Sequence, residues 1–355
     1  MIHEAIQKAV TGEDLSRVEA EAAMEQILTG SSSDAQIAAL LTALRMKGET
    51  VDELVGFATS MRRHAALTFR PLANAESAAL VDTCGTGGDA RGTFNISTAA
   101  AFVVAGAGVR VAKHGNRSIS SRCGSADVLE HFGVRMDMPA ERVAQAIEEV
   151  GIGFLFAPAV HTATRHAMPV RRELRMRTVF NLLGPLTNPA GATAQVVGVY
   201  HADLTELMAR ALGELGVKRA FIVHGADGLD EISISGETAI AELRDGVVRR
   251  YTVTPEDFGL HRAPLEAIQG GTAKQNAEII HKILGRSMLY RPHGPYREIV
   301  LANAAAALVA AERAADFLDG VAIAAKSIDC GAARERLEAL VAFSQFERGQ
   351  GQAAS

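Results

Sequence analysis

The chain has 355 residues, of which 48% are hydrophobic and 22% are charged, and its formal net charge is −5. This length is enough for a large core divided between domains, and the negative charge disfavours a general nucleic-acid-binding surface, which would be basic. No apolar run approaches the ~18 residues of a membrane span and the first residues lack a signal-peptide pattern, so we expect a cytoplasmic protein that binds neither membrane nor nucleic acid.

Residues 1–70 have the pattern of a helical domain. Three pairs have the capping-box spacing that marks helix starts: Ser16 with Glu19, Ser33 with Gln36, and Thr50 with Glu53. The apolar stripes of these helices are wider than mutual packing requires. The surplus surface is expected to cover either the rest of the chain or a partner subunit, and the pattern alone leaves both open.

A polar, proline-containing stretch at 70–77 predicts a linker, and short apolar runs alternate with helical patterns after it. These runs lie at 79–83, 109–112, 153–156, 195–200 and 219–223. Such alternation predicts an α/β fold with a mostly parallel central sheet flanked by helices. An Asp-Gly turn at 245–246 predicts an antiparallel hairpin over 238–253, and helices are expected at 273–284, 296–311 and 332–343.

We therefore expect three parts in the chain. Residues 1–70 form a smaller all-helical domain, which helices around 161–185 can join. Residues 75–345 form the α/β domain, and 346–355, rich in glycine, glutamine and alanine, form a mobile tail.

A glycine-rich loop follows the first predicted strand. Gly85, Gly87 and Gly88 allow positive φ angles and close approach of a ligand to bare backbone. Several N–H groups in such a turn can point at one anion, and Asn95 or Ser97 can cap the helix that follows. The loop is a candidate phosphate-binding loop.

A second polar loop follows the next strand, and a pair of acidic residues follows a later one. The second loop gathers cations, an amide and hydroxyls, which suit a polyanion that also carries sugar oxygens: Lys113, His114, Asn116, Arg117, Ser118, Ser120 and Ser121. The pair Asp230 and Glu231 predicts a Mg²⁺ site, because carboxylate oxygens are preferred ligands of this ion.

Each feature alone also has an ordinary structural explanation. An isolated Gly-Thr-Gly-Gly sequence is as often a simple turn, and isolated cations or an acidic pair are usually solvated. The three cysteines, Cys84, Cys123 and Cys330, are too far apart for a zinc motif and are interpreted as small packing residues. The three polar features, each placed after a predicted strand, make a shared ligand site the better interpretation.

In combination, these residues resemble the anthranilate phosphoribosyltransferase family over about residues 3–345. The motifs that carry the resemblance are Gly85-Thr86-Gly87-Gly88-Asp89, Asn95-Ile96-Ser97-Thr98, Lys113-His114-Gly115-Asn116-Arg117-Ser118, Gly124-Ser125-Ala126-Asp127 and the stretch 179–189. The resemblance implies transfer of the 5-phosphoribosyl group from phosphoribosyl diphosphate to anthranilate in tryptophan biosynthesis. It also implies Mg²⁺ as cofactor and a homodimer built through the helical domain.

The resemblance assigns residues to three groups. Those expected to bind phosphoribosyl diphosphate are Gly85, Gly87, Gly88, Asp89, Thr93, Asn95, Ser97, Thr98, Lys113, Asn116, Arg117, Ser118, Ser120, Ser121, Gly124 and Ser125. Those expected around anthranilate are Gly85, His114, Asn116 and Arg171, the last as the partner of the anthranilate carboxylate. Ser97, Asp230 and Glu231 are expected to hold metal, and no covalent nucleophile is expected.

Two other functions share parts of this pattern. Pyrimidine nucleoside phosphorylases have a similar architecture and phosphate loop, but the stretch 113–118 departs from what we expect of them. A non-catalytic relative that binds nucleic acid would have a basic surface and eroded metal carboxylates, whereas here Asp230 and Glu231 are both present.

Overall fold

The computed structural model describes residues 1–66, 79–118, 122–285 and 294–346. The predicted linker, Ser120, Ser121 and nearly all of the predicted tail lie outside these ranges. Within them, none of the helices is both long enough and apolar enough to cross a membrane.

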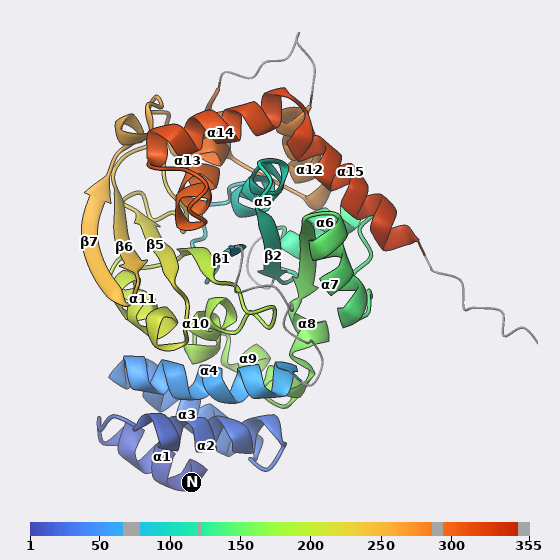
Figure 1. The fold of residues 1–355 in the computed structure, drawn as a ribbon. Coiled ribbons are helices and arrows are strands. Elements are labelled where there is room, and N and C mark those ends of the chain that lie inside the picture. Colours follow the sequence, from blue (N-terminus) through green and yellow to red (C-terminus); the bar gives the residue numbers. More distant parts are fainter. Residues whose placement is uncertain (67–78, 119–121, 286–293, 347–355) are drawn as a thin grey trace, which may run out of the picture.

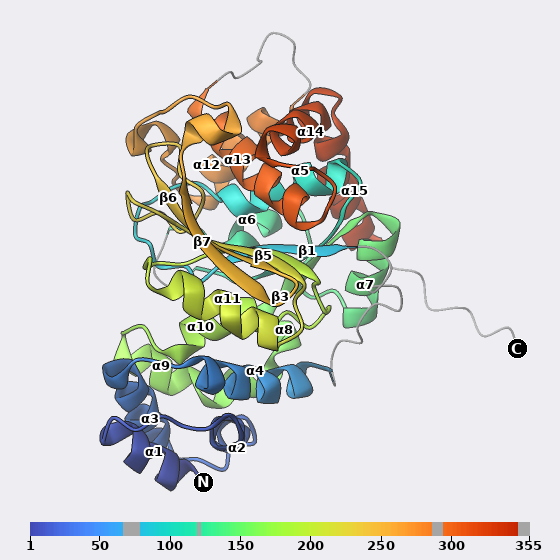
Figure 2. The same ribbon diagram turned by 60° about the vertical axis from the view of Figure 1, so that its left-hand side comes forward.

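The first four helices form a layer below the rest of the molecule (Figures 1 and 2). Their bounds are Ile2–Val10 (α1), Arg17–Leu28 (α2), Asp34–Lys47 (α3) and Val51–Ala66 (α4). The capping boxes expected at Ser16 and Ser33 are confirmed, and Thr50 and Glu53 exchange the equivalent two hydrogen bonds. These caps satisfy N–H groups that the first helical turns leave free.

The remaining chain builds a seven-stranded sheet in the order β3-β2-β1-β4-β5-β6-β7. The strands are Leu80–Gly85 (β1), Arg110–Gly115 (β2), Ile152–Phe156 (β3), Ala194–Gly198 (β4), Arg219–Gly225 (β5), Thr238–Arg244 (β6) and Val247–Val253 (β7). β1 to β5 are parallel, and β6 and β7 add an antiparallel edge. The predicted mostly parallel sheet and the hairpin are therefore confirmed, and Asp245 and Gly246 have the positive φ angles that a tight hairpin turn requires.

Helices cover both faces of the sheet, as buried parallel strands require. On the upper side in Figure 2 lie Ile96–Gly106 (α5), Ala273–Leu284 (α12), Pro295–Ala310 (α13), Phe317–Asp329 (α14) and Ala332–Gln345 (α15). On the side toward the helical layer lie Val179–Leu186 (α10) and Leu204–Glu214 (α11). Ser125–His131 (α6) and Ala140–Glu149 (α7) connect β2 to β3.

The stretch 157–174 forms three short pieces at the start of the region where helices were expected around 161–185. It contains Ala157–Val160 (α8), a 3-10 turn at Thr162–His166 and Met168–Leu174 (α9). Residues of α9, α10 and α11 share a single apolar cluster with those of α1 to α4. The helical layer is thus continuous with the lower face of the sheet.

Arg62 on α4 connects the layers by a polar contact. Its Nε donates to the carbonyl of Leu186 at 2.7 Å, and its Nη1 donates to that of Leu215 at 2.8 Å. Both carbonyls lie at helix ends, where backbone acceptors lack partners inside the helix. Burial lowers the pKa of Arg62 to about 10, so the side chain is still a cation at neutral pH.

Candidate active site

The chain reverses its direction across the sheet between β1 and β4. From β1 it proceeds outward through β2 to β3, then returns to place β4 on the other side of β1. Ligands of open α/β sheets bind at such a switch point, beyond the carboxyl ends of the strands. Here those ends are Gly85 of β1 and Gly198 of β4, which pair in register.

Asp230 lies against these two glycines. A Cβ atom on Gly198 would be 1.6 Å from the Asp230 carbonyl oxygen, and one on Gly85 would be 3.1 Å from Asp230 Oδ2. Only residues without a side chain allow the acidic loop to lie this close to the strand ends. Gly198 was missed in the sequence, where a glycine inside a predicted strand was the available signal of close approach.

Three carboxylates gather at this point. The pKa of Asp230 is raised first by burial and then by the nearby Asp89, while a hydrogen bond from the Gly87 backbone opposes the rise. The pKa of Glu231 is raised by burial and by Asp230, and Lys113 opposes the rise. Asp89 Oδ2 is buried without a hydrogen-bond partner. The cluster therefore holds negative charge that the protein itself does not fully compensate.

Ser97 contacts one residue of the acidic pair and one residue of the second polar loop. Its backbone N–H donates to Glu231 Oε1 at 3.1 Å, and Lys113 Nζ lies 3.4 Å from its hydroxyl and 2.5 Å from the carbonyl of Thr83. Neither Asn95 nor Ser97 caps α5 with its own side chain, so that expectation was wrong. Instead, Glu231 accepts the hydrogen bond from the backbone N–H of Ser97 in the first turn of α5, because the fold brings the two residues together.

The donor set suits Mg²⁺. The described residues contain no group of three or more histidine, cysteine or acidic side chains arranged to hold a metal by themselves. Mg²⁺ does not need such a cage, because it usually binds one or two carboxylates and completes its shell with water and substrate phosphates. Asp230 and Glu231, with the hydroxyl of Ser97 nearby, offer only oxygen ligands, and a cation would relieve their mutual repulsion.

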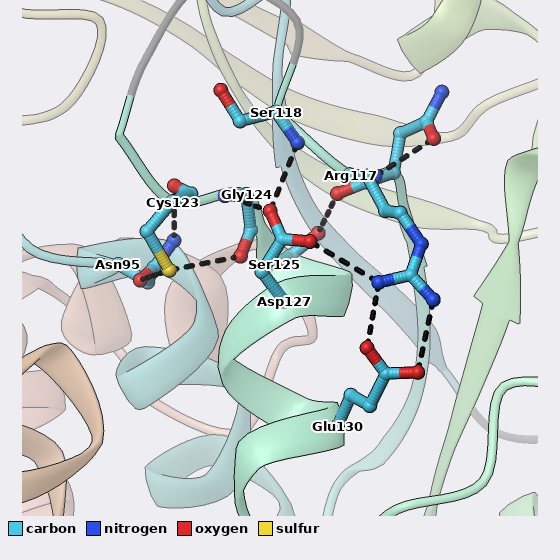
Figure 3. A network of polar contacts seen from close by, with 9 residues as sticks. Asn95, Arg117, Ser118, Cys123, Gly124, Ser125, Asp127 and Glu130 are labelled. Atoms are coloured by element: carbon cyan, nitrogen blue, oxygen red, sulfur yellow. Dashed lines mark hydrogen bonds and ion pairs between the residues drawn. The ribbon is translucent and has the colours of Figure 1, made fainter. Parts of the chain in front are cut away.

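The second polar loop is closed by Asp127 (Figure 3). Its Oδ2 accepts hydrogen bonds from Ser118 N at 3.1 Å and Gly124 N at 2.8 Å. Arg117 turns toward α6 and pairs with Glu130 at 2.6 Å and with Asp127 at 3.3 Å. In this conformation Arg117 fastens the loop to α6 rather than pointing at the glycine-rich loop.

The other predicted members of the second loop are held by local contacts. Asn116 accepts from Arg117 N at 2.7 Å through its side chain, and its carbonyl accepts from Ser125 Oγ at 3.3 Å. A Cβ on Gly124 would be 2.4 Å from Ser118 N, so the loop needs glycine at that position. Ser120 and Ser121, also predicted here, are outside the described residues.

Three further predicted residues lie around the start of α5. Asn95 donates to the carbonyl of Cys123 at 3.2 Å, and Thr93 forms a single bridge with Gln269. The buried hydroxyl of Thr98 has no hydrogen-bond partner. Burial raises the pKa of the Cys84 and Cys123 thiols, which agrees with their interpretation as packing residues.

A second part of the site lies along one face of α10. His114 Nδ1 is 3.1 Å from the carbonyl of Gly184, and the Arg171 guanidinium lies over the Phe180 ring at 5.0 Å. Positions 180 and 184 are one turn apart, so both side chains meet the same face of the helix. His161 packs edge-on to His114, with ring centroids 5.1 Å apart.

The electrostatics of this part favour an anionic ligand. Burial lowers the pKa of Arg171, and no carboxylate among the described residues pairs with it. Burial also lowers the pKa of His114, and that of His161 to about 3, so both rings are neutral at physiological pH. The Nε2 atoms of both are buried without partners. The sequence did not single out His161, because histidines on helices are usually exposed or satisfied.

Comparison with known proteins identifies the class. Two family profiles match the chain: a glycosyl transferase family helical bundle domain at residues 3–65, and a glycosyl transferase family a/b domain at residues 77–334. The chain is therefore a glycosyl transferase with the helical-bundle and α/β domains of that family.

Two similar proteins give the particular family. The chain is 57% identical to an anthranilate phosphoribosyltransferase from Solibacter usitatus, over 96% of this chain and 97% of the relative. It is 56% identical to the enzyme of that name from Moorella thermoacetica, over 97% and 98% of the two chains. The protein belongs to the anthranilate phosphoribosyltransferase family.

Solved structures agree with this assignment. The anthranilate phosphoribosyltransferase of Thermus thermophilus matches with a TM-score of 0.88 at 45% identity, covering 96% of this chain and 99% of that one. The Saccharomyces cerevisiae enzyme in complex with PRPP and Mg matches with a TM-score of 0.85 at 26% identity, covering 97% of both chains.

Proposed function

We propose that the protein transfers the 5-phosphoribosyl group from phosphoribosyl diphosphate to the amine of anthranilate, giving N-(5-phosphoribosyl)anthranilate and diphosphate in tryptophan biosynthesis. The observation that carries the proposal is the meeting of the glycine-rich loop, Lys113 and the acidic pair around Ser97. The part of the site along α10 adds Arg171, a largely buried cation that no described carboxylate neutralises. Two anthranilate phosphoribosyltransferases that are 57% and 56% identical to this chain support the reaction.

The donor is assigned to the switch point between β1 and β4. The N–H groups of the 85–89 loop and the start of α5 at Asn95, Ser97 and Thr98 would bind the diphosphate, because helix starts and bare turns favour anions. Lys113, whose Nζ lies 3.4 Å from Ser97 Oγ, would attract the phosphates. Thr93 and the second loop, with Asn116, Arg117, Ser118, Ser120, Ser121, Gly124 and Ser125, are assigned to the remaining phosphate and sugar oxygens.

Ser97, Asp230 and Glu231 would hold Mg²⁺. When bound, this ion neutralises charge that develops on the leaving diphosphate. Asp230 and Glu231 must be ionised to bind the ion, and the strand-end glycines fix where their loop lies. The cost of burying two adjacent carboxylates thus prepares the site for a cation.

The acceptor is assigned to the space along α10 where His114 of β2 contacts Gly184 and Arg171 of α9 contacts Phe180, with Gly85 and Asn116 at its donor side. Arg171 would donate two parallel hydrogen bonds to the anthranilate carboxylate. The neutral rings of His114 and His161 offer flat surfaces for an aromatic acceptor and add no competing charge. The amine would then face the ribose carbon of the donor.

No covalent nucleophile is required. The lone pair of the aromatic amine can attack a ribose carbon that becomes cation-like as diphosphate leaves, so catalysis depends on position and on charge stabilisation. His114 donates from Nδ1 to the Gly184 carbonyl, because a carbonyl can only accept. Its Nε2 therefore carries the lone pair of a neutral ring.

The experiment follows anthranilate fluorescence when protein, phosphoribosyl diphosphate and Mg²⁺ are mixed. We expect the signal to fall as product forms, with product and diphosphate appearing in equal amounts, and no change when Mg²⁺ is chelated. Aniline, which lacks the carboxylate, serves as the control acceptor. A constant signal, together with release of thymine from thymidine and phosphate, would replace this proposal with phosphorolysis.

We further propose a cytoplasmic homodimer that forms through the helical domain at 1–70. Val10, Val18 and Met46 are 68%, 75% and 84% exposed. They lie near one end of the helical layer, where Lys8 pairs with Glu19 and Lys47 pairs with Asp14, joining the ends of α1, α2 and α3. Exposed apolar side chains gathered in this way are typical of a surface that a second subunit covers.

A further inference from the structure

The segment between α9 and α10 carries an arginine that the proposed function does not use. Arg177 Nη2 donates a hydrogen bond to the carbonyl of Gly88 in the glycine-rich loop. Its guanidinium also lies 4.1 Å from the centre of the Tyr200 ring, just after β4. Two separate contacts thus fix an exposed side chain beside the site.

The loop that Arg177 contacts has an unusual backbone. Gly87 and Gly88 have φ angles of 66° and 84°, and Ala90 has 56°, all in the left-handed region. A non-glycine residue has a conformational cost there, so the loop needs contacts from outside to keep its shape. Tyr200 N donates to Thr86 Oγ1 at 3.2 Å on one side of these residues. On the other side, Gly270 N donates to the carbonyl of Gly92 at 2.8 Å.

Along the chain, the contact of Arg177 with Gly88 lies between these two hydrogen bonds. In a trans peptide, the carbonyl of one residue and the N–H of the next point in opposite directions. A donor that holds the Gly88 carbonyl outward therefore turns the N–H of Asp89 inward. A positive charge on the carbonyl side also strengthens that N–H as a donor.

We propose that Arg177 is a positioning residue of the donor site, which aims the N–H of the Gly88–Asp89 peptide at the diphosphate of the bound donor. This inference rests on the proposed function. Arg177 acts through the backbone of the loop and does not touch the substrate. Because the same short segment joins α9, which carries Arg171, to α10, it ties the donor loop to the acceptor side of the site.

Arginine is specifically suited to this position. Its planar group can stack on Tyr200 while its edge donates to the carbonyl, which a lysine ammonium cannot do in the same geometry. A Cβ on Gly88 would be 3.2 Å from Arg177 Nε, so glycine at 88 also leaves room for the guanidinium.

The test compares Arg177→Gln and Arg177→Lys with Arg172→Gln, an exposed arginine on α9 that contacts none of these groups. Calorimetry with phosphoribosyl diphosphate and Mg²⁺ measures donor binding without the acceptor, and steady-state kinetics gives both KM values. For Arg177→Gln we expect donor binding to weaken about tenfold, as for loss of a charge-assisted hydrogen bond, with the KM for anthranilate changed less than about twofold. Arg177→Lys should lie between Arg177→Gln and wild type.

A double-mutant cycle with Tyr200→Leu separates positioning from direct contact. If Arg177 acts through its stacked geometry, adding Tyr200→Leu to Arg177→Gln costs little more than Arg177→Gln alone. Fully additive losses would mean that Arg177 acts independently of its stacking on Tyr200, and would overturn the inference. Donor binding equal to that of Arg172→Gln, or an equal rise of both KM values with a lower melting temperature, would also overturn it.

The failure of this inference is distinguishable from that of the proposed function. Weakened donor binding in Arg177→Gln, in a protein that transfers nothing to anthranilate, would refute the acceptor while leaving Arg177 in its role. Normal donor binding in Arg177→Gln, in a protein that does form phosphoribosylanthranilate, would refute only the role of Arg177.

Discussion

At the scale of single residues, Arg171 gives the sharpest prediction. Arg171→Ala should raise the KM for anthranilate by roughly 10- to 100-fold, because a bidentate charge-assisted contact is lost, and should change the KM for phosphoribosyl diphosphate much less. Arg172→Ala, which changes an exposed neighbour, is the control. Equal effects of Arg171→Ala on the two constants would remove Arg171 from the acceptor site.

Gly198 gives a second prediction at this scale. Gly198→Ala would place a methyl group 1.6 Å from the Asp230 carbonyl oxygen, so the acidic loop must move. We expect the Mg²⁺ concentration for half-maximal activity to rise at least about tenfold, as it would for a displaced ligand shell. The control is Gly236→Ala, at a bend where φ is not positive and a Cβ atom meets nothing within 4 Å. An unchanged Mg²⁺ requirement in Gly198→Ala would show that Asp230 and Glu231 do not hold the ion.

The residue types in the sequence were a better guide to the chemistry of the site than to which residues contact one another. The acidic pair and the glycine-rich loop were recognisable because their composition is unusual for their position. The cap on α5 was not recognisable in the sequence, because Glu231 lies 134 positions from Ser97. Local sequence does not indicate which distant acceptor will bind a helix start. The pairing of Arg117 with Glu130 was missed for the same reason: a loop cation finds its partner only after the loop and α6 have packed.

At the scale of elements, the turn between α3 and α4 contains a carboxylate that the fold disfavours. Burial raises the pKa of Glu49, and Arg45 and Lys47 only partly offset the effect. A raised pKa means that its contribution to stability is fully present below the usual value near 4.3 and is lost as the pH rises through the raised value. The ionised form therefore destabilises the protein at neutral and higher pH.

Glu49→Gln removes this charge. The variant should melt at a higher temperature than the wild-type protein near neutral pH and above, and the difference should disappear under acidic conditions, where wild-type Glu49 is protonated. Thermal unfolding across a pH series measures this. The matched control is Glu13→Gln at an exposed position. A gain in melting temperature that persists unchanged at low pH would contradict the assignment to Glu49 ionisation.

Helices, strands and turns could be predicted from the sequence where interactions between neighbouring residues determine them. Capping boxes, apolar runs and the Asp-Gly turn each fixed a helix start, a strand or a hairpin, because their energetics involve neighbouring residues. The break of 157–174 into α8, a 3-10 turn and α9 was not foreseen, since it depends on fitting that stretch between the sheet edge and the helical layer.

At the scale of the whole molecule, the proposed dimer is testable by light scattering. Val18→Glu combined with Met46→Glu would place charges on the exposed apolar end of the helical layer. We expect the mass to fall from that of two chains to that of one, with little change in the circular dichroism spectrum, because neither side chain is buried in the subunit. A mass of two chains in the double variant would place the interface elsewhere.

The reach of Arg62 from α4 to the ends of α10 and α11 has a thermodynamic consequence. Detaching the helical layer from the sheet would break both hydrogen bonds of Arg62 and uncover the apolar cluster that both parts share. Neither the helical layer nor the α/β part can therefore unfold first without a large cost in free energy. A single calorimetric endotherm is therefore the expected signature of this protein, and its two sequence domains behave as one cooperative folding unit.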